Sequence, residues 1–180
     1  MSHSMSSVQP CEVPQDSLLC RYKGGAGFAD CYVIEVHKAV TQAAFVEAFY
    51  TSPLFKVERT LLKYLASSPA TDDDVKMLAA GSATRFSAWS VESQSASELL
   101  LADFTGNTRS WLRASPVDGP NSLPSTRLYF GSAVVARSRN PGRNPDVGWL
   151  FHALLGFHRI YSRLLLSAAG RRVGRMNTRV

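Results

Sequence analysis

The chain has 180 residues, of which 45% are hydrophobic and 19% are charged, and its formal net charge at pH 7 is +6. This length and composition predict one globular domain with a core of its own, and they exclude a disordered chain. Residues 1–10 are rich in serine and lack an apolar segment, which argues against a secretory signal and favours a cytoplasmic location.

The positive charge is concentrated in the second part of the chain. Residues 1–74 carry 6 basic and 9 acidic side chains, whereas residues 75–180 carry 14 basic and 5 acidic side chains. Such an imbalance can attract nucleic acid or anionic lipid. The basic residues are scattered except in the tail, so a solvated arginine-rich surface is the simpler interpretation, and we do not expect nucleic acid as the partner.

Three cysteines, Cys11, Cys20 and Cys31, fit neither a paired metal motif nor an even disulfide framework. We therefore expect reduced thiols, and neither a metal ion nor another cofactor. The sequence also lacks the HExxH, GxSxG, Walker and CxxC motifs, so no catalytic signature assigns a reaction.

The predicted organisation is a flexible N-terminal segment at 1–24, a single domain at 25–172 and a basic flexible tail at 173–180. The domain begins with a strand at 29–37, where valine, isoleucine and tyrosine alternate with other residues.

Two or three short helices are predicted after this strand. Thr41 is placed to cap a helix that runs to Tyr50, and Pro53 occupies the first position of a second helix. Thr71 caps a third helix, whose first turn holds three aspartates and which ends at Gly81. Three acids at the positive end of a helix need no metal ion to explain them.

An antiparallel meander is predicted in the middle of the chain, with strands at 85–92, 98–104, 108–114 and 126–136. The dipeptide Gly106-Asn107 predicts a two-residue hairpin turn, in which Asp103 faces Ser110 and Leu101 faces Leu112. Asp103 and Ser110 would then share one sheet face with leucine side chains.

A long helix is predicted from Asn144 to about Arg172, with its C-terminal cap at Gly170. It has one narrow polar stripe, formed by His152, Gly156, Arg159, Arg163 and Ser167. Its other positions are almost all apolar, which is typical of a helix held in a groove of protein. Arginines near its middle argue against a membrane span, so no transmembrane segment is expected.

The order of these elements resembles the helix-grip fold of the START-like superfamily, which includes lipid-transfer domains and polyketide cyclases. The resemblance covers about residues 29–172 and rests on architecture. It implies an α+β fold, in which a curved antiparallel sheet wraps around the long C-terminal helix and leaves a cavity between them. The sequence indicates five strands, whereas that fold usually has six or seven.

Four segments also resemble an uncharacterised bacterial protein family. They are Phe49-Tyr50-Thr51-Ser52-Pro53-Leu54-Phe55, Thr108-Arg109-Ser110-Trp111-Leu112, Phe130-Gly131-Ser132-Ala133-Val134-Val135 and Phe157-His158-Arg159-Ile160-Tyr161-Ser162-Arg163. This likeness implies a bacterial source and supplies no activity or catalytic residues.

The expected cavity contains candidate catalytic residues. His158 and Tyr161 project from the apolar side of the helix, and Asp103 lies on the facing sheet. A carboxylate beside an imidazole raises its basicity and orients it for acid–base catalysis. The alternative is a packed histidine, with Asp103 accepting hydrogen bonds from turn amides. The candidate ligand-binding residues are Leu101, Ser110, Leu112, Leu154, Phe130 and Trp89.

Three functions follow as hypotheses from this arrangement. The first is the binding of an apolar or amphipathic small molecule in the cavity. The second is an enzyme of the cyclase, dehydratase or hydrolase kind that uses His158 and Asp103. The third is nucleic-acid or anionic-membrane binding, which would require a contiguous basic surface formed by Arg109, Arg113, Arg127, Arg171 and Arg172. The oligomeric state does not follow from the sequence.

Overall fold

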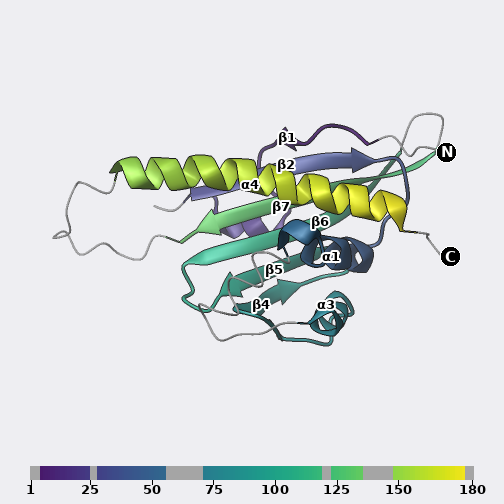
Figure 1. The fold of residues 1–180 in the computed structure, drawn as a ribbon, viewed down its shortest axis with the longest axis horizontal. Coiled ribbons are helices and arrows are strands. Elements are labelled where there is room, and N and C mark those ends of the chain that lie inside the picture. The colour runs from purple at the N-terminus through teal and green to yellow at the C-terminus, as the bar shows by residue number, and fades with distance from the viewer. Residues whose placement is uncertain (1–4, 25–27, 56–70, 119–122, 136–147, 177–180) are drawn as a thin grey trace.

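The computed structural model describes residues 5–24, 28–55, 71–118, 123–135 and 148–176, with the side chains of the last range described from residue 158 onward. Its centre is one antiparallel sheet with the strand order β1-β2-β7-β6-β5-β4-β3. The helix α4 (Gly148–Arg175) lies across one face of this sheet (Figure 1). The predicted α+β class, with a curved sheet around a long C-terminal helix, is confirmed.

The strands are β1 (Gln9–Pro10), β2 (Phe28–Val36), β3 (Arg85–Phe86), β4 (Trp89–Gln94), β5 (Glu98–Asp103), β6 (Thr108–Asp118) and β7 (Pro124–Val134). The other helices are η1 (Leu18–Tyr22), α1 (Gln42–Tyr50) and α3 (Asp72–Ala79). The second predicted helix, which begins at Pro53, falls mostly outside the described residues.

The described sheet has seven strands, two more than the sequence indicated. The predicted strand at 85–92 is divided by a turn at Ser87, whose φ of 52° lies in the left-handed region, into β3 and β4. The other additional strand is β1, which pairs with β2 at the edge of the sheet. Two-residue strands are too short to show a period-two pattern, which is why the sequence does not reveal them.

Two threonines cap helices as predicted. The Thr41 side chain accepts a hydrogen bond from the Ala44 amide at the start of α1. At the start of α3, Thr71 and Asp74 form a reciprocal capping box. In the same turn, Asp73 pairs with Lys76.

The main core lies between α1, α4 and the sheet face that they cover, here called the inner face. Phe45, Phe49 and Tyr50 of α1 are buried there against Phe130 of β7 and other apolar side chains. From α4 the same core receives Leu165, Leu166, Ala169 and Val173, at the spacing of one helix face. The opposite side of α4 is open to solvent, and Ile160 and Leu164 are exposed.

The helix α4 continues to Arg175, past Gly170, where the sequence predicted its end. Gly170 serves close packing instead. A Cβ atom at this position would lie 2.9 Å from Met5 Sδ and 3.3 Å from Ile34 Cδ1. Its missing side chain therefore lets α4 approach β2 and the N-terminal segment, and Val173 beyond it is buried.

The N-terminal residues 5–24, which were expected to be flexible, are attached to the sheet, and the part from Cys11 to Tyr22 packs on its other face, here called the outer face. Val13 and Leu19 form a second core there with Leu100 and Trp111. The buried Glu98 fixes this arrangement, because its Oε2 accepts hydrogen bonds from the Leu18 amide at 2.8 Å and from Trp111 Nε1 at 2.7 Å. This attachment depends on contacts between distant parts of the sequence, so local patterns do not show it.

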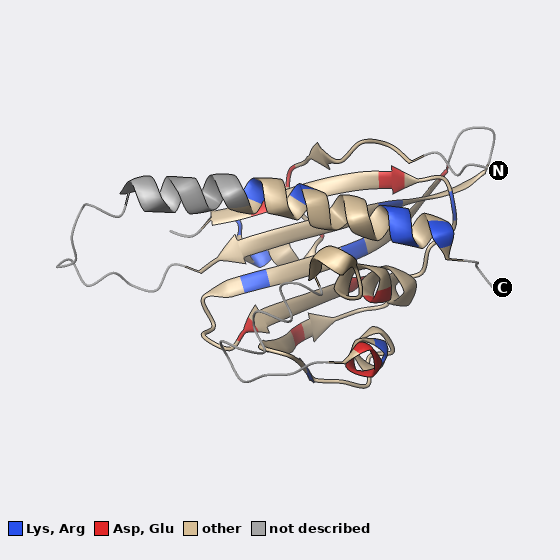
Figure 2. Cartoon of the chain, viewed as in Figure 1, with Lys and Arg blue, Asp and Glu red and all other residues tan. Residues whose placement is uncertain are grey.

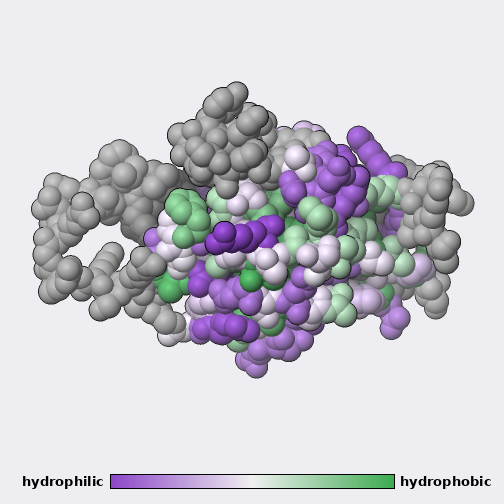
Figure 3. All heavy atoms as spheres, turned by 90° about the horizontal axis from the view of Figure 1, so that it is seen from below, coloured by the Kyte–Doolittle hydropathy of each residue, from purple (hydrophilic) through white to green (hydrophobic). Residues whose placement is uncertain are grey.

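The sheet has one edge at β1 and the other at β3, and the second edge lies beside β4, whose side chains are mostly polar. Viewed from this side, the described surface is largely hydrophilic with scattered hydrophobic side chains (Figure 3). A short edge strand with a polar border is unsuited to pairing with another chain.

Candidate functional site

A groove of about 590 Å³ lies beside the C-terminal half of α4. One wall is Pro53 and Leu54, which follow α1, and the other wall belongs to α4. The α4 residues that line it are Leu164, Ala168, Arg171, Arg172, Arg175 and Met176. Volumes of about 300–1,000 Å³ are typical of sites for small molecules.

Three arginines of this groove have no anionic partner within the described part of the chain. Basic residues gather at this end of α4 (Figure 2), and none of Arg171, Arg172 and Arg175 forms an ion pair with a described carboxylate. Nε of Arg172 is buried and has no hydrogen-bond partner among the described residues. A buried guanidinium nitrogen without an acceptor is costly, so a bound anion would stabilise this arrangement.

The end of the helix is held by Lys38, from the loop that follows β2. Lys38 Nζ donates to the carbonyl oxygens of Val173 and Met176. Because the last carbonyls of a helix carry partial negative charge, this amine stabilises the helix end and adds to the positive potential beside the groove.

His158, a predicted catalytic residue, belongs to a different cluster, which lies closer to the N-terminal end of α4 than the groove does. Its Nε2 lies 2.7 Å from Ser132 Oγ on β7 and 3.4 Å from Ser162 Oγ. Ser132 in turn donates a hydrogen bond to Asp30 Oδ1 on β2 at 2.6 Å. Because an ionised carboxylate can only accept, Ser132 donates to Asp30, and its oxygen can accept a hydrogen bond from the His158 tautomer that is protonated at Nε2. The cluster joins α4 to two neighbouring strands.

The carboxyl group of Asp30 is largely buried in this cluster. Burial raises its pKa, but hydrogen bonds from His158 and Ser132 outweigh burial, so its pKa lies below the ordinary value. Burial and the nearby Asp30 raise the pKa of Tyr32 to about 12. The guanidinium of Arg163 lies 5.6 Å from the centre of the Tyr32 ring.

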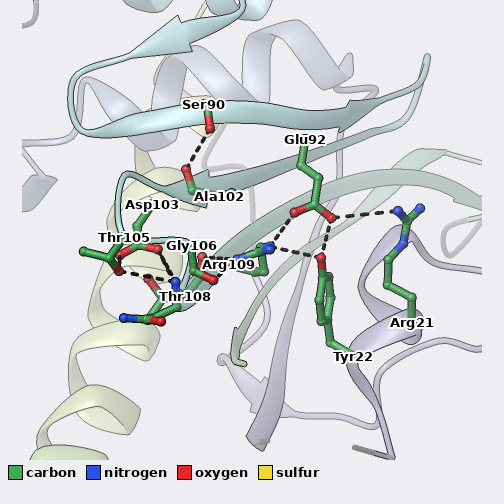
Figure 4. Close-up of polar contacts among 11 residues, drawn as sticks. Arg21, Tyr22, Ser90, Glu92, Ala102, Asp103, Thr105, Gly106, Thr108 and Arg109 are labelled. Carbon is green, nitrogen blue, oxygen red and sulfur yellow. Dashed lines mark hydrogen bonds and ion pairs between the residues drawn. The ribbon is translucent and has the colours of Figure 1, made fainter. Parts of the chain in front are cut away.

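Asp103 and His158, the predicted acid–base pair, have separate partners in the structure. Asp103 accepts hydrogen bonds from the Asn107 and Thr108 amides and from the Thr105 hydroxyl (Figure 4). These bonds outweigh burial and lower the pKa of Asp103. The alternative interpretation, a carboxylate that caps a turn, therefore describes Asp103, and the carboxylate beside His158 is Asp30.

The same turn explains the register of the β5–β6 hairpin. Leu101 pairs with Ser110 and Leu99 with Leu112, a shift of two residues from the predicted pairing. An even shift keeps each side chain on its predicted face, so the leucines do lie on the inner face.

The predicted ligand-binding residues lie largely inside the main core. Leu101 and Leu112 are fully buried, and Phe130 packs against Phe49 at a ring-centre distance of 4.8 Å. Ser110 lies 3.4 Å from the Tyr50 hydroxyl. Trp89 and Tyr161 are partly buried at the border of this core. The Leu154 side chain is outside the described residues.

Three of the five arginines in the expected basic surface are paired with carboxylates. Arg109 contacts Glu92 and Tyr22 on the outer face (Figure 4). Arg113 pairs with Asp16, and Arg127 pairs with Glu35. For the other two, Arg171 and Arg172 in the groove, no carboxylate partner occurs among the described residues.

The sequence pattern revealed neither the groove nor the cluster of Asp30, Ser132 and His158. The arginines of the groove were assigned partly to the tail, because Gly170 was interpreted as the helix end. The strand pattern contained a signal for Asp30, since Asp30, Tyr32 and Ile34 share one face of β2. A carboxylate on a face directed to the core requires a buried partner.

Comparison of the chain with protein-family models, with curated proteins and with solved structures finds no match in any of the three. None of the helices in the described ranges combines the length and hydrophobicity needed to cross a bilayer.

Proposed function

We propose that this protein binds an amphipathic small anion of the fatty-acid class in the groove beside the C-terminal half of α4. The observation that carries the proposal is the combination of an apolar wall with three arginines that lack carboxylate partners among the described residues. This site differs from the expected cavity between sheet and helix, where the described side chains are packed together.

The two halves of the groove match the two halves of such a ligand. Leu54, Leu164 and Met176 offer apolar surface to a hydrocarbon chain, at about 0.8 kcal/mol for each buried methylene. The guanidinium groups of Arg171 and Arg172 can bind a carboxylate through paired hydrogen bonds. A neutral or cationic ligand would leave these groups without a partner.

The architecture gives independent support for the ligand class. The order of strands and helices is compatible with the helix-grip arrangement of the START-like superfamily, in which lipid-transfer domains occur. This support is an analogy of fold, so the choice of an anionic ligand depends on the groove itself.

The two other hypotheses have less support from the geometry. An acid–base pair of His158 and Asp103 requires a carboxylate that is instead bound to the β5–β6 turn. Nucleic-acid binding requires a contiguous surface of free cations, whereas Arg109, Arg113 and Arg127 are paired with acids.

The proposal is tested by titrating the protein with cis-parinaric acid, a fatty acid that becomes fluorescent in an apolar site. We expect saturable binding at one site, and about 3- to 10-fold weaker binding after Arg171→Gln or Arg172→Gln. The corresponding fatty alcohol should compete poorly, because it lacks the carboxylate. Leu164→Asp should prevent binding without unfolding the protein, because Leu164 is 50% exposed.

Arg159→Gln provides the matched control, because Arg159 is an exposed arginine of the same helix outside the groove. Equal effects of Arg159→Gln and Arg172→Gln would show that binding follows net charge alone. Binding to vesicles of anionic phospholipid, without binding of the free acid, would identify a membrane contact. Either result would overturn the proposal.

A further inference from the structure

Cys11 and Cys31 form a pair of neighbouring thiols where the N-terminal segment meets the sheet. Their sulfur atoms are 2.9 Å apart, and the Cys11 amide donates a hydrogen bond to the Cys31 carbonyl at 2.9 Å. Cys11 directly follows β1 and continues its pairing with β2, in which Gln9 and Pro10 face Val33 and Tyr32. The two cysteines are therefore cross-strand neighbours.

The two thiols differ in exposure and in acidity. Cys31 is buried, whereas Cys11 is partly exposed. The hydrogen bond from Cys31 lowers the pKa of Cys11, although burial opposes this effect. Its bond to Cys11 and its burial raise the pKa of Cys31. Cys11 is thus the thiol that ionises first and that a small oxidant reaches first.

We propose that Cys11 and Cys31 form a redox-active dithiol, which a small disulfide such as oxidised glutathione converts into an intramolecular disulfide. The Cys11 thiolate attacks one sulfur of oxidised glutathione, its S–S bond breaks, and one glutathione thiolate leaves. Cys31 loses its proton to solvent and attacks the Cys11 sulfur, which releases the second glutathione. Two protein thiols are oxidised and one glutathione disulfide is reduced.

The backbone geometry needs no rearrangement for this reaction. Directly opposite residues of antiparallel strands have Cα atoms about 4.5–5.5 Å apart, which lies within the range that a disulfide bridges. The third cysteine, Cys20, lies in η1 and forms no thiol pair within the described part of the chain. It is therefore an internal control for selectivity.

The disulfide would change how the N-terminal segment is attached. In the reduced protein, hydrogen bonds and the second core on the outer face hold this segment on the sheet. A covalent bond between Cys11 and Cys31 would stop the segment from separating from β2, so oxidation would reduce its local opening.

The test is to treat the full-length protein with oxidised glutathione and to measure its mass and free thiols. We expect the mass to fall by two hydrogen atoms, and the number of thiols that Ellman's reagent detects after unfolding in denaturant to fall by two. Digestion should give one cross-linked peptide pair, which contains Cys11 and Cys31. Cys20→Ser should behave like the wild type. Cys11→Ser should form no intramolecular disulfide.

The attachment is measured by amide exchange of the segment before and after oxidation. Slower exchange should occur in the wild type and in Cys20→Ser, and not in Cys11→Ser. A disulfide that contains Cys20, or a stable glutathione adduct on Cys11 that Cys31 never displaces, would overturn the proposal. The test compares the wild type with variants of Cys11 and Cys20. It needs no substitution of Cys31, which is buried and whose replacement could unfold the protein.

Discussion

Asp30 of β2 lies directly opposite Ser132 of β7, and the serine hydroxyl donates to the Asp30 carboxylate at 2.6 Å. His158 joins this pair from α4, so one hydrogen-bonded chain connects the helix with the two strands beneath it. Directional bonds of this kind fix the position of a helix that apolar contacts alone would leave free to slide or rotate.

The first prediction concerns the pH dependence of stability. Because the pKa of Asp30 lies below its ordinary value in the folded protein, its carboxylate stabilises the fold near neutral pH. This contribution is lost as the pH falls below about 4, through the lowered pKa. Asp30→Asn should cost about 1–3 kcal/mol at pH 7, and its difference from the wild type should shrink toward pH 3. Urea unfolding across this range measures the effect.

Asp118→Asn is the control for this experiment, because Asp118 is exposed at the end of β6. It should change stability by less than about 0.5 kcal/mol at any pH. A constant difference between Asp30→Asn and the wild type from pH 7 to pH 3 would contradict the assignment.

The second prediction compares two glycines. A Cβ atom at Gly131 would lie 2.5 Å from Leu19 Cδ2, 2.9 Å from the Asp30 carbonyl oxygen and 3.0 Å from Trp111. Gly131→Ala should therefore destabilise the protein by about 1–3 kcal/mol, because backbone cannot move aside as a side chain can. Gly174→Ala, in α4, should stabilise it by up to about 1 kcal/mol, because its Cβ meets nothing within 4 Å. Thermal melts that rank the two variants in the opposite order would disprove this account.

The third prediction tests how the N-terminal segment is attached. Glu98→Ala removes the acceptor of the Leu18 amide and of Trp111 Nε1, and should cost about 1–3 kcal/mol. Limited proteolysis should then cut residues 5–24 faster than in the wild type. Glu12→Ala is the control, since the Glu12 side chain is 94% exposed. If both variants are cut at the wild-type rate, Glu98 does not hold the segment.

The fourth prediction separates Asp103 from ligand binding. Asp103→Ala removes the bonds that hold the β5–β6 turn, so it should destabilise the protein by about 1–2 kcal/mol. It should leave the affinity for cis-parinaric acid unchanged, because Asp103 does not line the groove. Its melting temperature and its titration are measured on the same preparation. A large loss of affinity in a folded variant would return Asp103 to the candidate site.

Local rules predicted the elements whose structure depends on near neighbours. The capping roles of Thr41 and Thr71 follow from a few adjacent residues, and both are confirmed. The hairpin faces were correct, while its register was wrong by two residues, because Asp103 and Thr105 stabilise a longer turn than Gly106-Asn107 alone indicates.

The other features of the fold and of the site depend on contacts between residues that are distant in the sequence, and the periodicity of the sequence does not reveal such contacts. Gly170 has the residue type of a helix cap, and only the approach of Met5 and Ile34 reveals its packing role. Asp30 could be assigned to an inward face, but its partner Ser132 is 102 positions away in the chain. The groove could not be predicted, because it forms between residues beyond α1 and the last turns of α4.

The attachment of the N-terminal segment also determines the order in which the chain can assemble. Leu18 and Asp16 bind Glu98 and Arg113, which follow them by 80 and 97 positions. During synthesis the segment emerges before β5 and β6, yet the surface that receives it exists only after these two strands have formed. Leu19, which packs against Leu100 and Trp111, therefore stays in solvent until β5 and β6 have formed, so an early part of the domain becomes protected late.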